Sequence, residues 1–351
     1  MRYTAPSILV FLILMACNQQ GSKEPSSTPS KKDSLQEKNI SSVTACILSE
    51  IAYCTNPQKE MDQYMPGWKI VWDPVAVGGN YAFVATDGNV YALAIRGSLI
   101  EFTWEAFDNW IYNDLNIAYQ KDWPYTNNVS GARISQGAYT GWDNLNRMTD
   151  KKTRKSLWSF LQANVGDKKP LTITGHSLGG NLASVYASYL WKKFKDSGHP
   201  KNDISVITFA APAAGNGSFA DDFNNKFPNS LRIENINDIV PKFPVSAKVS
   251  DLGSLYSPSP SASEISVGYK NVTVKLSNVF VTISAALDLL RITNGISPYV
   301  QTNGLGDLIT VKLSGKNTKN EITDWFAEAA YQHGIDSYAQ QIGAPVIKCT
   351  P

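Results

Sequence analysis

A glycine-rich segment near the middle of the chain carries the strongest chemical signal. From Gly175 to Gly179 it reads Gly-His-Ser-Leu-Gly, a pattern that places Ser177 on a sharp turn between a strand and a helix. An apolar run at residues 171–174 predicts the strand, and apolar spacing in residues 181–194 predicts the helix. Larger side chains beside the serine would collide in such a turn. The segment therefore indicates a nucleophilic serine, against the alternative of an idle serine in a glycine-rich turn.

A serine hydroxyl needs a base near neutral pH, and histidine is the usual one. The chain has 3 histidines. His176 precedes the serine in the turn, so its side chain is predicted to point away from the hydroxyl and to pack as a structural residue. His199 lies beyond the following helix, roughly 25 Å from the serine at the rise of an α-helix. By elimination His333, which Gly334 frees from a helix end, is the predicted base rather than an ordinary core or surface histidine.

An acidic residue must orient the imidazole and stabilise its charged form. Asp238 directly follows a strand-like run at residues 231–236. Because the carboxyl ends of parallel strands share one sheet edge, Asp238 can face the serine. The two aspartates at 221–222 are predicted to be solvated helix residues, and Asp203 precedes a strand at the opposite edge. The resulting order of serine, aspartate and histidine is that of α/β-hydrolases.

The elements that must position these side chains alternate between strand and helix. Short β-rich runs separated by helical patterns occur at residues 171–174, 204–210 and 231–236. This order predicts an α/β fold with a largely parallel central sheet. Upstream, residues 81–86 and 90–96 flank Asp87-Gly88, which predicts a hairpin. Residues 42–54 are predicted to be helical and residues 70–77 to form a strand.

The segment of residues 245–315 is less regular. It contains an almost uniformly apolar stretch at residues 279–292, which is too short to span a membrane. A buried helix is preferred to the alternative, part of a cap over the site.

The first residues resemble a bacterial export signal. An apolar run at residues 8–16 ends in Leu-Met-Ala and is followed by Cys17, which is similar to a lipobox. This predicts a signal peptide at residues 1–16, acyl chains on Cys17 and a flexible tether at residues 17–40. A plain secretory signal with an accidental cysteine is the alternative. Because residue 18 is not aspartate, a membrane-anchored lipoprotein in the outer membrane or facing the periplasm is favoured.

Composition limits the partners. The 351 residues include 32 Lys and Arg against 30 Asp and Glu, a net charge of +2, so nucleic acid is not an expected partner. No sequence feature suggests a metal or an organic cofactor. The oligomeric state is left open.

Together these motifs resemble the class 3 (fungal-type) lipase family. The resembling segments are residues 95–98 (IRGS), 175–180 (GHSLGG), 208–216 (TFAAPAAGN) and 237–244 (NDIVPKFP). The resemblance implies an α/β-hydrolase domain over residues 41–351, with a central mostly parallel sheet, a nucleophile elbow and a lid. The sequence departs from the family's pattern at residues 134–138, which lack the usual His and Phe, so the choice of substrate is in doubt. Residues 245–315 read as an insertion or cap.

The resemblance also implies roles for residues near the nucleophile. Ser98 and the N–H of Leu178 would form the oxyanion hole. Phe102, Trp104 and Phe107 would belong to a mobile lid over residues 99–108, against the alternative of an ordinary amphipathic surface helix.

A disulfide is another implication of the resemblance, which places a cysteine of the N-terminal helix against the C-terminal segment. Cys46 and Cys54 are eight residues apart on one predicted helix, roughly 12 Å, and so are too distant to pair with each other. The implied pair is Cys54 and Cys349, with Cys46 buried and free.

The implied activity is a serine carboxylic ester hydrolase that acts on acylglycerols. A phospholipase A1 or a soluble-ester esterase is an alternative, since one triad serves all of them. A peptidase or thioesterase using the same elbow, and a non-catalytic surface lipoprotein that binds lipid or a partner, are less favoured.

Overall fold

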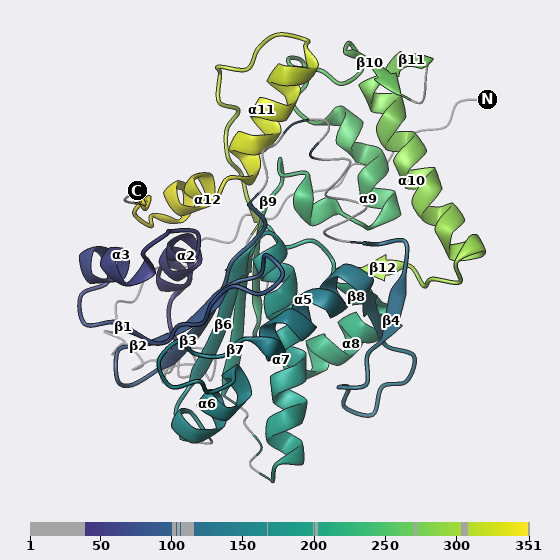
Figure 1. Ribbon diagram of the computed structural model, residues 1–351. Coiled ribbons are helices and arrows are strands. Elements are labelled where there is room, and N and C mark those ends of the chain that lie inside the picture. Colours follow the sequence, from purple (N-terminus) through teal and green to yellow (C-terminus); the bar gives the residue numbers. More distant parts are fainter. Residues whose placement is uncertain are drawn as a thin grey trace, which may run out of the picture.

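The computed structural model describes residues 39–99, 103, 106, 116–166, 168–198, 200, 203–269, 272–302 and 308–349. Within these residues a seven-stranded sheet forms the centre of the molecule (Figure 1). Its spatial order is β1 (Lys69–Trp72), β2 (Ala82–Thr86), β3 (Tyr91–Ile95), β6 (Leu171–His176), β7 (Ile204–Phe209), β9 (Leu231–Asn235) and β13 (Leu308–Ile309). The strands from β3 to β13 run parallel, as predicted.

The antiparallel edge confirms the predicted hairpin. β2 and β3 pair from Thr86 with Tyr91 to Ala82 with Ile95. The Asp87 side chain accepts from the N–H of Asn89 and so closes the turn. β1 is shorter than the predicted strand at residues 70–77. It stops before Pro74, because proline has no N–H to donate to a neighbouring strand.

Helices cover both faces of the sheet, and alternate side chains of β2 point to opposite sides. Ala82 and Val84 lie in the larger apolar core, while Phe83 and Ala85 lie in the other. The larger core is covered by α5 (Gln136–Arg147), α6 (Leu157–Asn164), α7 (Leu178–Asp196) and α8 (Gly217–Lys226). The other core is covered by α2 (Ser42–Ile51), α3 (Pro57–Tyr64) and α12 (Ile335–Ile342). The sheet is therefore buried on both faces, as parallel sheets are.

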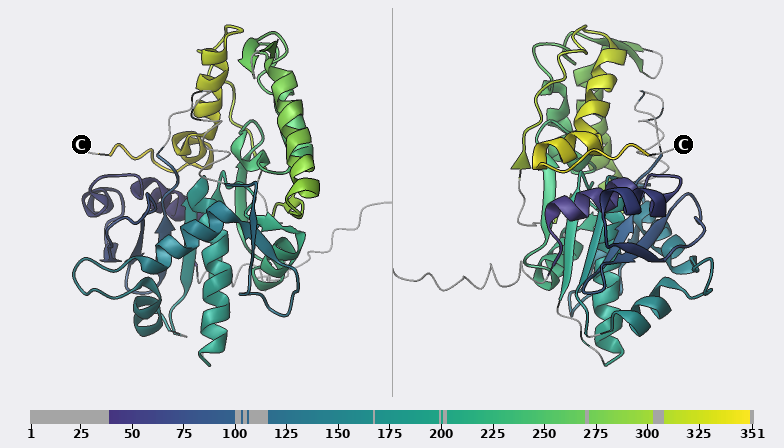
Figure 2. Two further views of the ribbon diagram at one scale, coloured as in Figure 1. Left: turned by 45° about the vertical axis from the view of Figure 1, so that its right-hand side comes forward. Right: turned by 90° about the vertical axis from the view of Figure 1, so that its left-hand side faces the viewer.

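Residues 245–300 lie beyond one end of the sheet, beside α11 (Ile322–His333) (Figure 2), whereas β13 further along the chain is the sheet's edge strand. This region contains α9 (Ser246–Val249), η3 (Ser250–Ser254), β10 (Ser266–Tyr269), β11 (Val272–Lys275), α10 (Leu276–Thr293) and β12 (Tyr299–Val300). The last of these strands joins a second sheet, in the order β12, β8 (Gly215–Asn216), β5 (Arg133–Ser135) and β4 (Gln120–Asp122). The region is thus tied to the rest of the domain by strand pairing as well as by side-chain packing.

The preference for a buried helix at residues 279–292 was wrong. The helix is α10, and only 28% of its 18 residues are buried. Phe280, Ile283 and Leu287 pack inward, but Leu289 is 56% and Ile292 is 83% exposed. By length and composition alone α10 could cross a membrane. Apolar residues occur all around this helix, so its sequence has no amphipathic spacing that would predict which face packs against the protein.

The prediction for the aspartates at 221–222 was wrong at Asp222. This carboxylate is 0% exposed and forms an ion pair of 2.6 Å with Lys226, one turn along α8. It also accepts from the backbone N–H of Asn127. Charged residues are buried when they are paired in this way.

Candidate active site

Ser177 occupies the turn between β6 and α7 in a strained conformation, with φ 59° and ψ −129°. The turn is possible because the chain approaches itself very closely at two glycines. A Cβ on Gly179 would lie 2.1 Å from the carbonyl oxygen of Ile95, and one on Gly175 would lie 2.4 Å from the backbone of Gly179. Alanine at either position would push β3 and the turn apart, which is the reason for the predicted glycines.

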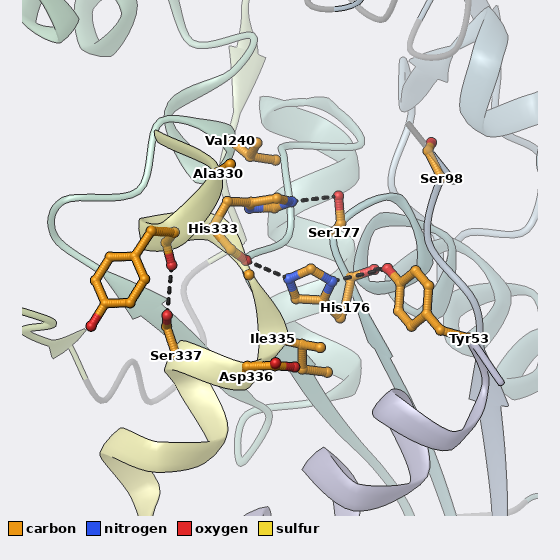
Figure 3. Close-up of a pocket in the computed structure, with 12 residues that line it drawn as sticks. Tyr53, Ser98, His176, Ser177, Val240, Ala330, His333, Ile335, Asp336 and Ser337 are labelled. Atoms are coloured by element: carbon orange, nitrogen blue, oxygen red, sulfur yellow. Dashed lines mark hydrogen bonds between the residues drawn. The ribbon is translucent and has the colours of Figure 1, made fainter. Parts of the chain in front are cut away.

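The structure brings the three predicted triad residues together. The Nε2 atom of His333 lies 2.9 Å from the Ser177 hydroxyl oxygen, and its Nδ1 atom lies 2.8 Å from a carboxylate oxygen of Asp238 (Figure 3). They come from the β6–α7 turn, the end of α11 and the loop after β9, and each is at most 6% exposed. The imidazole is therefore placed to accept the serine proton while the carboxylate holds the opposite N–H.

Two further groups hold Asp238. The hydroxyl of Tyr338 on α12 donates to it at 2.7 Å, and the backbone N–H of Val240 in η2 (Val240–Lys242) donates at 2.9 Å. Burial raises the pKa of Tyr338 well above its usual value, and the Asp238 charge raises it further, so this hydroxyl stays a donor. The sequence reasoning missed Tyr338, because no motif marks a tyrosine that meets an aspartate 100 residues away.

His176 is a buried, packed residue, as predicted, and it also makes hydrogen bonds beside the triad. Its ring lies 4.7 Å from the ring of His333, centroid to centroid. Its Nε2 atom lies 2.8 Å from the backbone oxygen of His333, and its Nδ1 atom lies 2.9 Å from the hydroxyl of Tyr53. Burial lowers the pKa of His176 well below its usual value, and His333 lowers it further. Tyr53, a second residue that sequence reasoning missed, follows α2.

A cavity of 480 Å³ opens beside the serine. Ser98, at the end of β3, lines it together with Ser177 and His333, and apolar walls come from Val240, Ala330 and Ile335 (Figure 3). Leu178 is the first residue of α7, where backbone N–H groups have no partner within the helix. The predicted oxyanion donors thus stand on the two elements that meet at the serine.

Comparison with known proteins agrees with this geometry. The family model Lipase (class 3) matches residues 92–248, which hold Ser98, Ser177 and Asp238. Over these residues the chain is similar to the class 3 lipase family. The crystal structure of M37 lipase is similar over 90% of this chain and 93% of that one, with a TM-score of 0.65 and 23% identity. That likeness establishes the α/β-hydrolase fold.

The sequence relatives of this chain are distant. A secreted mono- and diacylglycerol lipase 1 of Fusarium solani is 26% identical over 54% of this chain and 49% of its own length. Phospholipase A1-II 7 of Oryza sativa subsp. indica is 25% identical over 64% of this chain and 51% of its own length. The chain therefore spans about half the length of these relatives.

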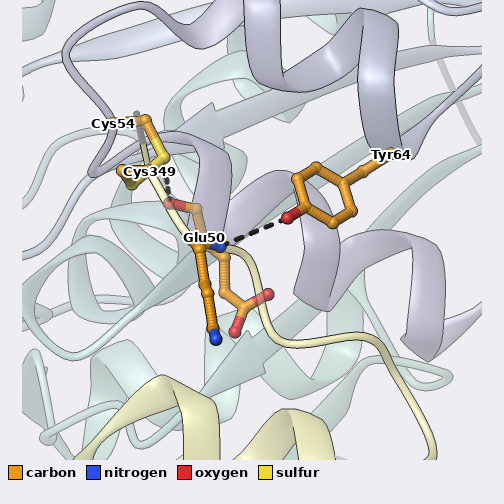
Figure 4. The surroundings of a disulfide bond; sticks show 5 residues. Glu50, Cys54, Tyr64 and Cys349 are labelled. Atoms are coloured by element: carbon orange, nitrogen blue, oxygen red, sulfur yellow. Dashed lines mark hydrogen bonds between the residues drawn. A yellow bond between two sulfur atoms is a disulfide. The ribbon is translucent and has the colours of Figure 1, made fainter. Parts of the chain in front are cut away.

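The structure contains the disulfide that the resemblance implies. Cys54 and Cys349 are bonded across 295 residues of sequence, with their Cα atoms 5.1 Å apart (Figure 4). Cys46 is buried and outside this bond. Beside the disulfide, Cys54 contacts the Glu50 backbone oxygen and the Lys348 N–H reaches the Tyr64 hydroxyl. The bond ties the segment after α2, including Tyr53, to the end of the chain.

Several predicted site residues lie outside the described residues. They are Cys17, His199 and the lid residues Phe102, Trp104 and Phe107. Among the residues that the structure describes, no group of three or more His, Cys, Asp or Glu side chains could hold a metal ion.

Proposed function

We propose that the protein is a serine carboxylic ester hydrolase that acts on acylglycerols. The hydrogen-bonded chain from Ser177 through His333 to Asp238 is the observation that carries this proposal. His333 takes the proton of Ser177 as the hydroxyl oxygen attacks the acyl carbonyl carbon. The resulting oxyanion accepts hydrogen bonds from Ser98 and the Leu178 N–H.

The second half of the reaction uses the same groups. His333 gives its proton to the departing alcohol, which leaves an acyl group esterified to Ser177. Water then attacks this ester, His333 accepts the water proton, and the fatty acid leaves as the proton returns to Ser177. Asp238 keeps its charge throughout, held by Tyr338 and the Val240 N–H.

The apolar wall of the cavity supports an acyl chain as the bound group. The printed names of the relatives support both acylglycerol and phospholipid substrates. A phospholipase A1 is therefore the second candidate, and a soluble-ester esterase the third.

A substrate panel tests the proposal. The purified full chain and its Ser177→Ala variant are compared on dispersed diacylglycerol and triacylglycerol, phosphatidylcholine vesicles and a short soluble ester. We expect the highest rate on acylglycerols and none in the variant. A higher rate on phosphatidylcholine would favour the phospholipase. Activity confined to the soluble ester would favour the esterase. Lipid binding without hydrolysis would favour a non-catalytic role.

We further propose that the chain is exported and held at a membrane by acyl chains on Cys17. The Leu-Met-Ala-Cys sequence supports this, as does the disulfide, because such bonds persist in oxidising compartments. Mass spectrometry of the mature N-terminus should find acylated Cys17. The Cys17→Ser variant should either be released from the membrane as a soluble chain or keep its signal peptide uncleaved. Unmodified Cys17 in the mature protein would contradict the anchor and the favoured outer-membrane or periplasm-facing location.

We also propose that residues 99–108 form a mobile lid over the active site. Phe102, Trp104 and Phe107 are costly to expose in water and favourable at a lipid interface. Replacing all three by serine should lower the rate on emulsified lipid about tenfold more than the rate on a soluble ester, given about 1.4 kcal/mol of lost interfacial stabilisation. Equal losses on both substrates would mean that residues 99–108 are an ordinary surface helix.

A further inference from the structure

While the His176 ring is neutral, its two hydrogen bonds have one consistent set of directions. The backbone oxygen of His333 can only accept, so the Nε2 atom of His176 carries a proton and donates it at 2.8 Å. In a neutral imidazole the other nitrogen is then an acceptor. The Tyr53 hydroxyl, 2.9 Å from Nδ1, must therefore be the donor (Figure 3).

Tyr53 is itself fixed in place. The backbone of Gly97 opposes the rise that burial causes in the pKa of Tyr53. A Cβ on Gly97 would lie 2.1 Å from that hydroxyl, so the strand end touches the tyrosine directly. Gly97 immediately precedes Ser98, the predicted oxyanion donor. Hydrogen bonds thus run from Tyr53 through His176 to the backbone of His333, and Gly97 packs against the first member of this line.

We propose that Tyr53 and His176 are positioning residues that hold the His333 backbone and keep the ring beside it uncharged during catalysis. This inference rests on the proposed function, because it matters only if His333 accepts a proton. When it does, a positive charge appears 4.7 Å from the His176 ring, centroid to centroid. A second positive charge at that distance would oppose the transfer.

The surroundings favour the neutral ring. Burial lowers the pKa of His176. The ring of Tyr338 lies 6.0 Å away on the α12 side and carries no charge in this pH range. The titratable and charged groups facing His176 or lining its end of the cavity are Tyr53, Arg96, His333, Asp336 and Tyr338.

Tyr53→Phe is the central test, because it keeps the ring that lines the cavity and removes only the donor. The Nδ1 atom of His176 then becomes free to take a proton as the pH falls. We expect the acid limb of kcat/KM to move upward by roughly one pH unit and kcat at pH 6 to fall about tenfold, with KM unchanged. Near pH 8 the variant should approach wild type. Tyr119→Phe, which removes the hydroxyl of an exposed tyrosine outside the cavity, is the matched control and should leave the profile unchanged.

A double-mutant cycle tests whether Tyr53 acts through His176 or only supports the structure in general. In His176→Gln the amide can still donate to the His333 carbonyl but cannot become charged. Adding Tyr53→Phe to this variant should therefore produce no further shift of the acid limb. A full shift in the His176→Gln background, or a pH profile of Tyr53→Phe parallel to wild type, would overturn the inference.

A measurement on the unaltered protein does not depend on how the variants fold. Nitrogen-15 NMR of the histidine rings should find His176 neutral, with its proton on Nε2, from pH 5 to pH 8. A charged ring, or a proton on Nδ1, would overturn the inference. Ser177→Ala separates a failure of the proposed function from a failure of this inference. If the variant still hydrolyses esters, the proposed function is wrong. If hydrolysis is lost but His176 titrates freely in the wild type, only this inference is wrong.

Discussion

The triad and the region of residues 245–315 are held by different kinds of contact. Ser177, His333 and Asp238 stand at the ends of buried elements, and directional hydrogen bonds fix each one. In the other region, the pairing of β12 with β8 is joined by apolar packing: the rings of Tyr256 and Phe280 lie tilted against Trp325 at 5.2 and 5.1 Å, and one apolar side of α10 is exposed. Hydrogen bonds at strand ends fix atoms to within a few tenths of an ångström, whereas apolar stacking tolerates changes of shape. Changes at the triad should therefore affect catalysis, and changes in the other region should affect stability.

The largest effect is expected at the triad. Ser177→Ala and His333→Ala should each lower kcat by roughly 10⁴- to 10⁶-fold, because the two residues act as one unit. The melting temperature should stay within a few degrees of wild type, which differential scanning calorimetry would show. Ser218→Ala, a serine of α8 outside the triad, is the matched control. Residual activity of a tenth or more in Ser177→Ala would assign the nucleophile elsewhere.

The disulfide should matter for stability alone. Closing a loop of 295 residues stabilises the fold by about 5–6 kcal/mol in the loop-entropy model. The Cys54→Ser and Cys349→Ser double variant should lose this in chemical denaturation, while Cys46→Ala keeps the bond and serves as control. Activity per folded molecule should change little. A double variant as stable as wild type would show that the bond adds nothing to folding.

Two neighbouring leucines of α10 sharpen the comparison. Leu287 is 6% exposed and packs inward, whereas Leu289 is 56% exposed. Leu287→Ala should cost about 2–4 kcal/mol of unfolding free energy, and Leu289→Ala at most about 0.5 kcal/mol. Urea denaturation compares them directly. Equal losses would mean that the outer face of α10 is covered in solution.

A smaller effect should follow pH. Burial above all, together with the Asp336 charge and against the opposing Ile347 N–H, raises the pKa of Glu50 to about 8. Because the folded-state value lies above the ordinary 4.5, protonated Glu50 favours the fold at low pH, and this contribution is lost as pH rises toward 8.

The melting temperature should therefore fall by about 2–4 °C between pH 5 and pH 8, corresponding to about 1 kcal/mol in a domain of this size. Glu50→Gln should remove most of that slope, and Glu264→Gln, at an exposed position, should not. An unchanged slope in Glu50→Gln would place its cause in other groups.

Much of the site could be predicted because its residues obey local rules. The elbow needs small residues around Ser177, a strand before it and a helix after it, and all of these are visible in a short window of sequence. Asp238 follows a strand whose direction is set by the parallel order. With 3 histidines in the chain, elimination left His333.

The remainder depends on contacts between distant segments. Tyr338 meets Asp238 across 100 residues, and Tyr53 meets His176 across 123, so no local pattern marks either one. Asp222 appeared solvated from its neighbours in the sequence, but its ion pair with Lys226 is covered by the packing of α8. The buried face of α10 was hidden because apolar residues occur all around that helix.

Covalent labelling tests the central claim most directly. The full chain is treated with a fluorophosphonate, which forms a stable ester with an activated serine hydroxyl, and the modified peptide is mapped by mass spectrometry. The structure predicts a single adduct on Ser177, formed much more slowly in His333→Ala and absent in Ser177→Ala. An adduct on another serine, or equal labelling of wild type and His333→Ala, would contradict the assignment of Ser177 as a nucleophile activated by His333.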